Sequence, residues 1–290
     1  MAGEERDIIL LLGSGGMTGI FTAGALEVID RKYRDRIHSI YATSSGADVG
    51  VYLAAGQADV PRRFFIDHLA TKQFIRGNWL SYIWKVFVAG ARSRVPDFID
   101  VDYVVSVARD SDCALDLAAL KHSPIGLFVK VIRIRDGQAL YLDAKNDLFQ
   151  ALKATFQCGP FTSAAVEIDG ESYIDGDTII STLDEDIARQ FPNKTIVYIE
   201  PADPAFGKKL LLYPFYLLAG FATMKLYGLS LGACYIRELF TDPSLPVRKR
   251  GNVVYLESRM SVSMFSTDLH QLTILHRHGV EEAERLLVDL

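Results

Sequence analysis

The sequence contains little cysteine. Only three of its 290 residues are cysteines, namely Cys113, Cys158 and Cys234, and they form no CxxC pair and lie far along the chain from any group of histidines. This spacing suggests neither a zinc site nor a disulfide framework. We therefore expect buried thiols in a reducing compartment and no metal centre.

The sequence also lacks a strong charge of either sign. Its 31 lysine and arginine residues are scattered rather than clustered, and 36 aspartate and glutamate residues leave a net charge of −5. Nucleic-acid binding needs a basic face, so we expect no nucleic acid among the partners.

Signals for targeting and for crossing a membrane are missing as well. The charged residues Glu4–Asp7 lead directly into an apolar stretch, without the basic start or the small-residue cleavage site of a signal peptide. The most apolar window, Leu210–Met224, contains Pro214 and is shorter than the roughly 20 residues that a bilayer-spanning helix needs. We expect a cytoplasmic protein.

No feature of the sequence divides the chain into domains. It has neither an internal repeat nor a linker rich in proline or serine, and 49% of its residues are apolar, enough for a large core. We therefore expect residues 1–290 to form a single α/β domain.

The first regular elements flank a glycine-rich loop. Asp7–Leu12 reads as a strand buried on both faces, which belongs in the middle of a parallel sheet. The loop Gly13–Gly19 follows, and apolar residues at helical spacing predict a helix over Ile20–Ile29. Unpaired N–H groups at a helix start can hold an anion or a developing oxyanion. A dinucleotide fingerprint is disfavoured, because Thr18 stands where its third glycine is needed.

A second stretch has the pattern of a nucleophile elbow. The apolar run Ile37–Thr43 predicts a strand and Ala47–Gly56 predicts a helix, with Ser44 at the turn between them. Small residues, Ala42 and Gly46, stand two positions before and two after the serine, where a strained turn leaves no room for larger side chains.

A third stretch supplies a carboxylate. Val166–Ile168 and Ser172–Ile174 predict a hairpin with Asp169-Gly170 as its turn, and Asp175-Gly176 follows at once. Because the hairpin turn is already accounted for, we expect Asp175 at the same kind of sheet edge as Ser44.

Other elements are predicted by periodicity alone. Acidic groups at Asp184–Asp186 and Glu281-Glu282 indicate solvated helix ends, and the last helix is amphipathic and is expected to pack on the sheet. The remaining predictions are a helix over Arg62–Ile75, a strand over Pro124–Arg135 turning into Ala139–Leu142, a helix over Leu148–Phe156, strands over Thr195–Glu200 and Asn252–Glu257, and apolar helical material over Leu210–Leu239.

Together the three motifs resemble the patatin-like phospholipases, over roughly residues 7 to 180. The resemblance rests on Ser14–Gly19 for the family's glycine-rich loop, Ala42–Gly46 for its serine elbow and Asp175-Gly176 for its Asp-Gly motif. It implies a three-layer α/β/α sandwich with a mainly parallel central sheet. The sequence departs from the family at Thr18, where Arg or Lys is usual, and at Ala42, where Gly is usual.

The resemblance also implies a Ser-Asp dyad that needs no metal or cofactor. Ser44 would be the nucleophile and Asp175 the general base, and the backbone N–H groups of Gly15 and Gly16 would form the oxyanion hole. The small residues that support these motifs are Gly19, Ala42, Gly46 and Gly176.

The expected activity is hydrolysis of fatty-acyl esters of lipids, as a phospholipase A, lysophospholipase or carboxylesterase. The partners would be a lipid or ester substrate and, transiently, a membrane interface. We expect the aromatic stretch Trp79–Phe87 and the apolar stretch Leu210–Leu218 to form the acyl groove.

Two alternatives stay open at this point. One is an ordinary α/β-hydrolase with the triad Ser44, Asp175 and His270, although His270, His276 and His278 are better explained as surface or helix-end residues. The other is a non-catalytic lipid-binding protein with the same fold, which the departures at Thr18 and Ala42 motivate.

Overall fold

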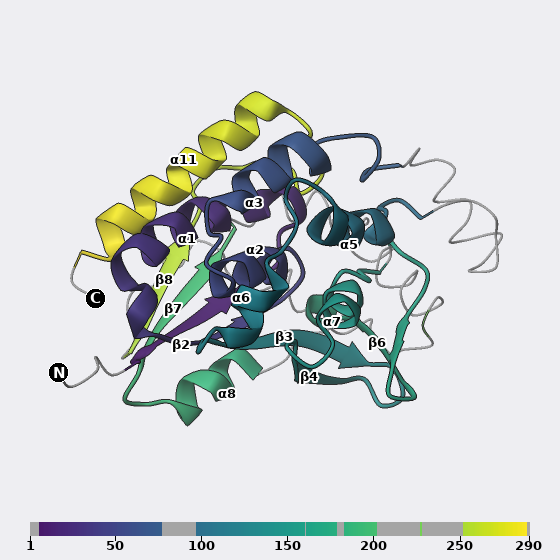
Figure 1. Ribbon diagram of the computed structural model, residues 1–290, viewed down its shortest axis with the longest axis horizontal. Helices are drawn as coiled ribbons and strands as arrows, with labels where there is room; N and C mark the ends of the chain where they lie inside the picture. Colours follow the sequence, from purple (N-terminus) through teal and green to yellow (C-terminus); the bar gives the residue numbers. More distant parts are fainter. Residues whose placement is uncertain are drawn as a thin grey trace.

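The computed structural model describes residues 6–76, 97–159, 161–178, 183–201, 227 and 252–288 (Figure 1). Within these described ranges, eight strands form one sheet with the order β5-β6-β3-β2-β1-β7-β8, and β4 pairs with β3 outside this path. The strands are β1 Ile8–Leu12, β2 Ile37–Ala42, β3 Gly126–Arg133, β4 Gln138–Asp143, β5 Val166–Ile168, β6 Glu171–Asp175, β7 Thr195–Glu200 and β8 Val253–Glu257.

The sheet is mainly parallel, as predicted. The pairs along β3-β2-β1-β7-β8 are all parallel, whereas β4, β5 and β6 pair antiparallel. All five residues of β1 are buried, and β1 lies between β2 and β7. The prediction of a central first strand is therefore confirmed.

Helices cover both faces of the sheet. Alternate residues of β1 face opposite sides: Ile8, Leu10 and Leu12 join the core beneath α1 and α2, whereas Ile9 and Leu11 join the core that contains Ile187 of α8. Figure 1 shows α8 on the side opposite to α1, α2 and α11, so the predicted three-layer arrangement is confirmed. The helices are α1 Gly19–Tyr33, α2 Ser45–Ala54, α3 Val60–Arg63, α5 Val101–Asp110, α6 Leu117–His122, α7 Leu148–Thr155, α8 Leu183–Gln190 and α11 Leu269–Leu286.

The last helix packs differently from the prediction. α11 exists, but it lies mainly on α1 and makes only a smaller contact with the sheet, at β8. The two helices approach each other very closely, since a Cβ on Gly24 would lie 2.1 Å from the carbonyl oxygen of His276, and a Cβ on Gly279 would lie 2.1 Å from that of Phe21. Amphipathic periodicity shows which face is buried but not the element that buries it.

One predicted helix is shorter than expected. Within Arg62–Ile75 the helical backbone ends at Leu69, where α3 has passed into a π-helical turn over Phe64–Leu69. Just beyond that point the hydroxyl of Thr71 donates to the carbonyl of His68, a bond that competes with continued helical bonding. Two helices, α5 and α6, were not predicted, although each begins at an aspartate cap, Asp100 and Asp116.

Several charged residues are less exposed than predicted. Asp184 is half-buried and bonded to neighbouring side chains, and Glu282 is buried beside Arg285, so neither is a solvated helix end. His276 is also buried, with Nε2 2.9 Å from Oε1 of Glu27. The sequence periodicity could not reveal the partners of Asp184 and His276, because they come from other elements.

Cys113 is closer to a histidine than its sequence position suggested. Ligand atoms of His68, Asp112 and Cys113 lie within 4.8 Å of one another, so the fold places one histidine beside this cysteine although His68 is distant from it in the sequence. The Asp112 carboxylate is already paired, at 2.7 Å from Nε2 of His68 and 3.6 Å from a guanidinium nitrogen of Arg63. We assign no ion to this group. Among the described helices, none is long and apolar enough to cross a membrane.

Candidate active site

Ser44 occupies a strained turn between β2 and α2. Its φ of 50° and ψ of −127° lie in a region that residues other than glycine rarely adopt. The turn brings α2 against the end of β1, so that a Cβ on Gly46 would lie 2.6 Å from the carbonyl oxygens of Leu12 and Gly13. Ala42, at the end of β2, is fully packed. The predicted strand–turn–helix is therefore present, with the serine at its tip.

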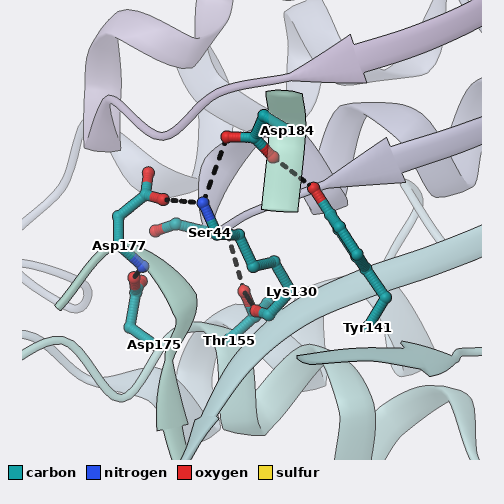
Figure 2. Close-up of polar contacts among 7 residues, drawn as sticks. All are labelled: Ser44, Lys130, Tyr141, Thr155, Asp175, Asp177 and Asp184. Carbon is teal, nitrogen blue, oxygen red and sulfur yellow. Dashed lines mark hydrogen bonds and ion pairs between the residues drawn. The ribbon is translucent and has the colours of Figure 1, made fainter. Parts of the chain in front are cut away.

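The backbone of the elbow is held by a threonine of α7. The Ser44 N–H donates to Oγ1 of Thr155 at 2.8 Å, and the Thr155 hydroxyl donates in turn to the carbonyl oxygen of Lys130 at 3.0 Å (Figure 2). Thr155 is completely buried, so water does not compete for these bonds. The Ser44 N–H is therefore already hydrogen-bonded and cannot serve as a donor to a bound substrate.

The glycine loop lies between β1 and α1, as predicted. Gly16 has a φ of 56°, and the Thr18 side chain donates to the carbonyl of Gly15 at 2.8 Å, which closes the turn before Gly19 begins α1. Met17 N–H donates to the carbonyl of Met264. Within the described part of the chain, the N–H groups of Gly15 and Gly16 donate to no carbonyl oxygen.

Asp175 ends β6 and is almost fully buried, with 1% of its surface exposed. Its Oδ1 accepts a hydrogen bond from the Asp177 N–H at 2.8 Å, whereas its buried Oδ2 accepts none from the described residues. Burial and the neighbouring charge of Asp177 raise the pKa of Asp175 to about 8, although the Asp177 N–H, the Ser44 side chain and Lys130 act in the opposite direction. The free oxygen can therefore receive a proton.

The pairing along β3 explains how the serine and the aspartate come together. β4 pairs with β3 along one edge, so β2 and β6 share the other. β2 ends at Ala42, opposite Val129, and β6 ends at Asp175, opposite Val131. The two strands thus meet end to end on either side of Lys130.

Lys130 lies at this junction, and its side chain is 4% exposed. Its Nζ is 3.4 Å from Oδ1 of Asp177 and 3.1 Å from Oδ2 of Asp184, and the Tyr141 hydroxyl donates to Asp184 at 2.5 Å (Figure 2). Burial alone would lower the pKa of Lys130, but the two carboxylates outweigh it and raise the pKa. A buried ammonium ion therefore stands next to the carboxyl groups of the site.

The family comparison agrees with this arrangement. The family model for the patatin-like phospholipases matches residues 10–188, a span that includes the glycine loop, the elbow and Asp175. The chain belongs to this family. No curated protein sequence matches it.

Two solved structures are similar to this patatin-like chain. VipD from Legionella pneumophila shares 13% identity with a TM-score of 0.45, covering 97% of this chain and 67% of VipD. A chain of the ExoU–SpcU complex from the type III secretion system of Pseudomonas aeruginosa shares 14% identity with a TM-score of 0.41. That match covers 98% of this chain and 51% of the other, so the present chain spans about half of its length.

Both departures of this member of the family from the usual motifs have a local explanation. Thr18 is buried and uses its hydroxyl to close the glycine loop, so it has a structural role of its own. Ala42 fits at the end of β2, where its methyl group is packed rather than strained. Gly19 lies against Ser45, since a Cβ there would lie 2.8 Å from the serine Cβ.

The remaining predictions for the site have different outcomes. His270 is exposed in the first turn of α11, and the described groups that act on the Asp175 carboxyl, Asp177, Ser44 and Lys130, include no histidine. The proposed groove segments Trp79–Phe87 and Leu210–Leu218 lie outside the described residues. Lys130, Thr155 and Asp177 were not identified as site residues from the sequence. A lysine within the apolar strand β3 was the available signal.

Proposed function

We propose that this protein is a serine acyl hydrolase that cleaves fatty-acyl esters of lipids, as a phospholipase A, lysophospholipase or carboxylesterase. Membership of the patatin-like phospholipase family supports lipid acyl hydrolysis in general. The observation that carries the specific proposal is the buried Oδ2 of Asp175, which has no hydrogen-bond partner among the described residues and belongs to a carboxyl group on which the Ser44 side chain acts.

In the first half-reaction Ser44 is the nucleophile. Its Oγ attacks the carbonyl carbon of the ester while the serine proton moves to Asp175, because a hydroxyl is a weak nucleophile without a base. The N–H groups of Gly15 and Gly16 stabilise the oxyanion, an effect of roughly a hundredfold or more per donor. The ester C–O bond then breaks, and Asp175 returns the proton to the departing alcohol.

In the second half-reaction water replaces the alcohol. Asp175 takes a proton from the water as its oxygen attacks the acyl carbon, and the bond to Ser44 breaks as the serine regains a proton. The products are a fatty acid and the free enzyme, so the cycle needs no metal or cofactor. A lipid substrate would bring the protein into transient contact with a membrane interface, and a cytoplasmic location stays a prediction.

Labelling with a fluorophosphonate probe tests the proposal. We expect wild type to be labelled, Ser44→Ala to give no label, and Asp175→Asn to be labelled at least tenfold more slowly, since the serine loses its base. His270→Ala is the matched control, and it should be labelled like wild type.

Each alternative has a distinct outcome in the same experiment. Loss of labelling in His270→Ala would favour a Ser-Asp-His triad over the dyad. A folded wild type that takes no label and hydrolyses no short-chain nitrophenyl ester would favour a non-catalytic lipid-binding protein.

A further inference from the structure

We propose that Lys130 is a positioning residue that joins Ser44 to Asp175, through its carbonyl oxygen on one side and its ammonium group on the other. This inference rests on the proposed function, because it gives Lys130 a task in the same site. It adds a residue that the three sequence motifs do not contain.

The backbone of Lys130 supports the nucleophile. Its carbonyl oxygen accepts the Thr155 hydroxyl at 3.0 Å, and Thr155 accepts the Ser44 N–H at 2.8 Å. The bond fixes the amide of a residue whose φ of 50° is unfavourable for a side chain larger than glycine. The last residue pair between β2 and β3 is Ala42 with Val129, one residue before Lys130. Strand β2 therefore does not extend to the Lys130 carbonyl, which is available to Thr155.

The same residue supports the base. A Cβ on Gly176 would lie 2.6 Å from the carbonyl carbon, the carbonyl oxygen and Cγ of Lys130, so the turn after Asp175 rests directly on the lysine. The ammonium group holds Asp177 at 3.4 Å, and the Asp177 N–H holds Oδ1 of Asp175 at 2.8 Å. Thus one residue contacts the supports of both reacting groups.

The ammonium group also balances the acids of the site. Asp177 raises the pKa of Asp175, and Lys130 lowers it. Asp184 is the second carboxylate that contacts the ammonium group of Lys130, and it accepts a hydrogen bond from the Tyr141 hydroxyl. Two more groups face this network: the charge of Asp175 acts on Tyr227, and the charges of Asp177 and Asp184 act on Tyr198.

The experiment compares Lys130→Met, Asp177→Asn and the double variant with wild type. Lys145→Met is the matched control, since Lys145 is a lysine that bonds to a backbone carbonyl, that of Ser123, and not to Asp177 or Asp184. The first readout is kcat/KM for a short-chain nitrophenyl ester from pH 5 to 10. The second readout is the free energy of unfolding over the same pH range, measured with and without Asp175→Asn in each background.

We expect Lys130→Met to move the acid limb of kcat/KM to higher pH by about one unit or more, which is a tenfold loss at pH 7. Asp177→Asn should move the limb to lower pH, and the double variant should lie between the two. The difference in unfolding free energy between each background and its Asp175→Asn counterpart depends on pH. The pH range of this dependence should move in the same directions as the acid limb of kcat/KM. Lys145→Met should leave both readouts unchanged.

Two results would overturn the proposal. One is a loss of activity by the same factor at every pH in Lys130→Met and Asp177→Asn, which would indicate only general structural damage. The other is an unchanged pH dependence of kcat/KM in Asp177→Asn. This variant keeps the test informative if Lys130→Met does not fold, because Asp177 is partly exposed and its replacement disturbs the core less. If folded wild type hydrolyses nothing, the proposed function fails, while the unfolding measurement still decides whether Lys130 acts on Asp175.

Discussion

The protonation of a single carboxyl group, that of Asp175, controls the proposed chemistry. The group must be ionised to accept the serine proton, yet burial and Asp177 raise its pKa to about 8. We therefore expect kcat/KM for a short-chain nitrophenyl ester to increase with pH, with a midpoint near pH 8 and a slope of one proton. A profile that is flat between pH 6 and 9 would contradict the assignment of Asp175 as the base.

Thr155 gives a second test at the scale of residues. In Thr155→Val the Ser44 N–H and the Lys130 carbonyl both lose a buried partner, so the elbow should relax from its reactive position. We expect a kcat lower by about tenfold to a hundredfold with little change in KM, since small displacements of reacting groups cost that much.

The conservative variant separates the hydrogen bonds from packing. Thr155→Ser keeps the hydroxyl and loses a methyl group, and its kcat should stay within severalfold of wild type. A loss in Thr155→Ser as large as that in Thr155→Val, with kcat measured at saturating substrate, would contradict a role that rests on the hydrogen bonds alone, because Thr155→Ser retains the hydroxyl.

The sequence predicts the reacting groups better than their supports. Ser44, Gly15, Gly16 and Asp175 follow from local turn patterns, and the proposed roles still depend on the experiments above. Lys130 has no local signal of that kind, because its partners come from the turn after β6, from α7 and from α8. Hydrogen bonds between elements distant in sequence are not visible in a single sequence.

Among elements, α1 and α11 pack very closely at Gly24 and Gly279. Alanine normally stabilises a helix by about 1 kcal/mol relative to glycine. In Gly24→Ala and Gly279→Ala the new methyl group would meet a backbone carbonyl oxygen at 2.1 Å, so we expect a net loss of about 1 to 3 kcal/mol in the free energy of unfolding.

Urea denaturation of both glycine variants measures that loss. Arg277→Ala is the control on the same helix, since Arg277 is exposed, and it should change the free energy of unfolding by less than about 0.5 kcal/mol. Glycine variants as stable as wild type would mean that the two helices separate at little cost.

The outcome of the element predictions follows from the kind of pattern used. The strands β1, β2, β7 and β8 were found because they are short and mostly apolar and have clear ends. α5 and α6 were missed although an aspartate cap begins each, since a single cap residue is also common in turns. The helix over Arg62–Ile75 was extended too far because apolar spacing continues beyond the residue at which the backbone bonds end.

For the whole molecule, the buried Asp175 makes stability depend on pH. Its folded-state pKa, about 8, is above the ordinary value of 3.8, so the folded protein binds this proton more tightly than the unfolded chain does. The stability that this group contributes is complete below about pH 4 and is lost as the pH rises towards 8.

Asp175→Asn should remove this pH dependence. Between pH 5 and 8 we expect the free energy of unfolding of wild type to fall, relative to the variant, by up to about 1.4 kcal/mol per pH unit. Urea unfolding at several pH values measures the difference. Parallel curves for the two proteins would contradict a raised pKa at Asp175.

The overall architecture, three layers included, was more predictable than the helices that make up each layer. Buried strands with short loops and helices between them specify a mainly parallel sheet with β1 in the middle. The helix that covers each face depends on long-range packing, so the sequence did not predict that α11 lies on α1 or that α8 covers the opposite face.

The strand order also gives the proposed reaction a handedness. The glycine loop follows β1, Ser44 follows β2, and Asp175 ends β6, which meets β2 end to end along the same edge of β3. The carbonyl oxygen of a bound ester would point towards β1, and its departing alcohol towards the aspartate that protonates it. Ser44 would then attack only one of the two prochiral faces of the carbonyl group. Between two mirror-image esters, the protein should therefore prefer one enantiomer.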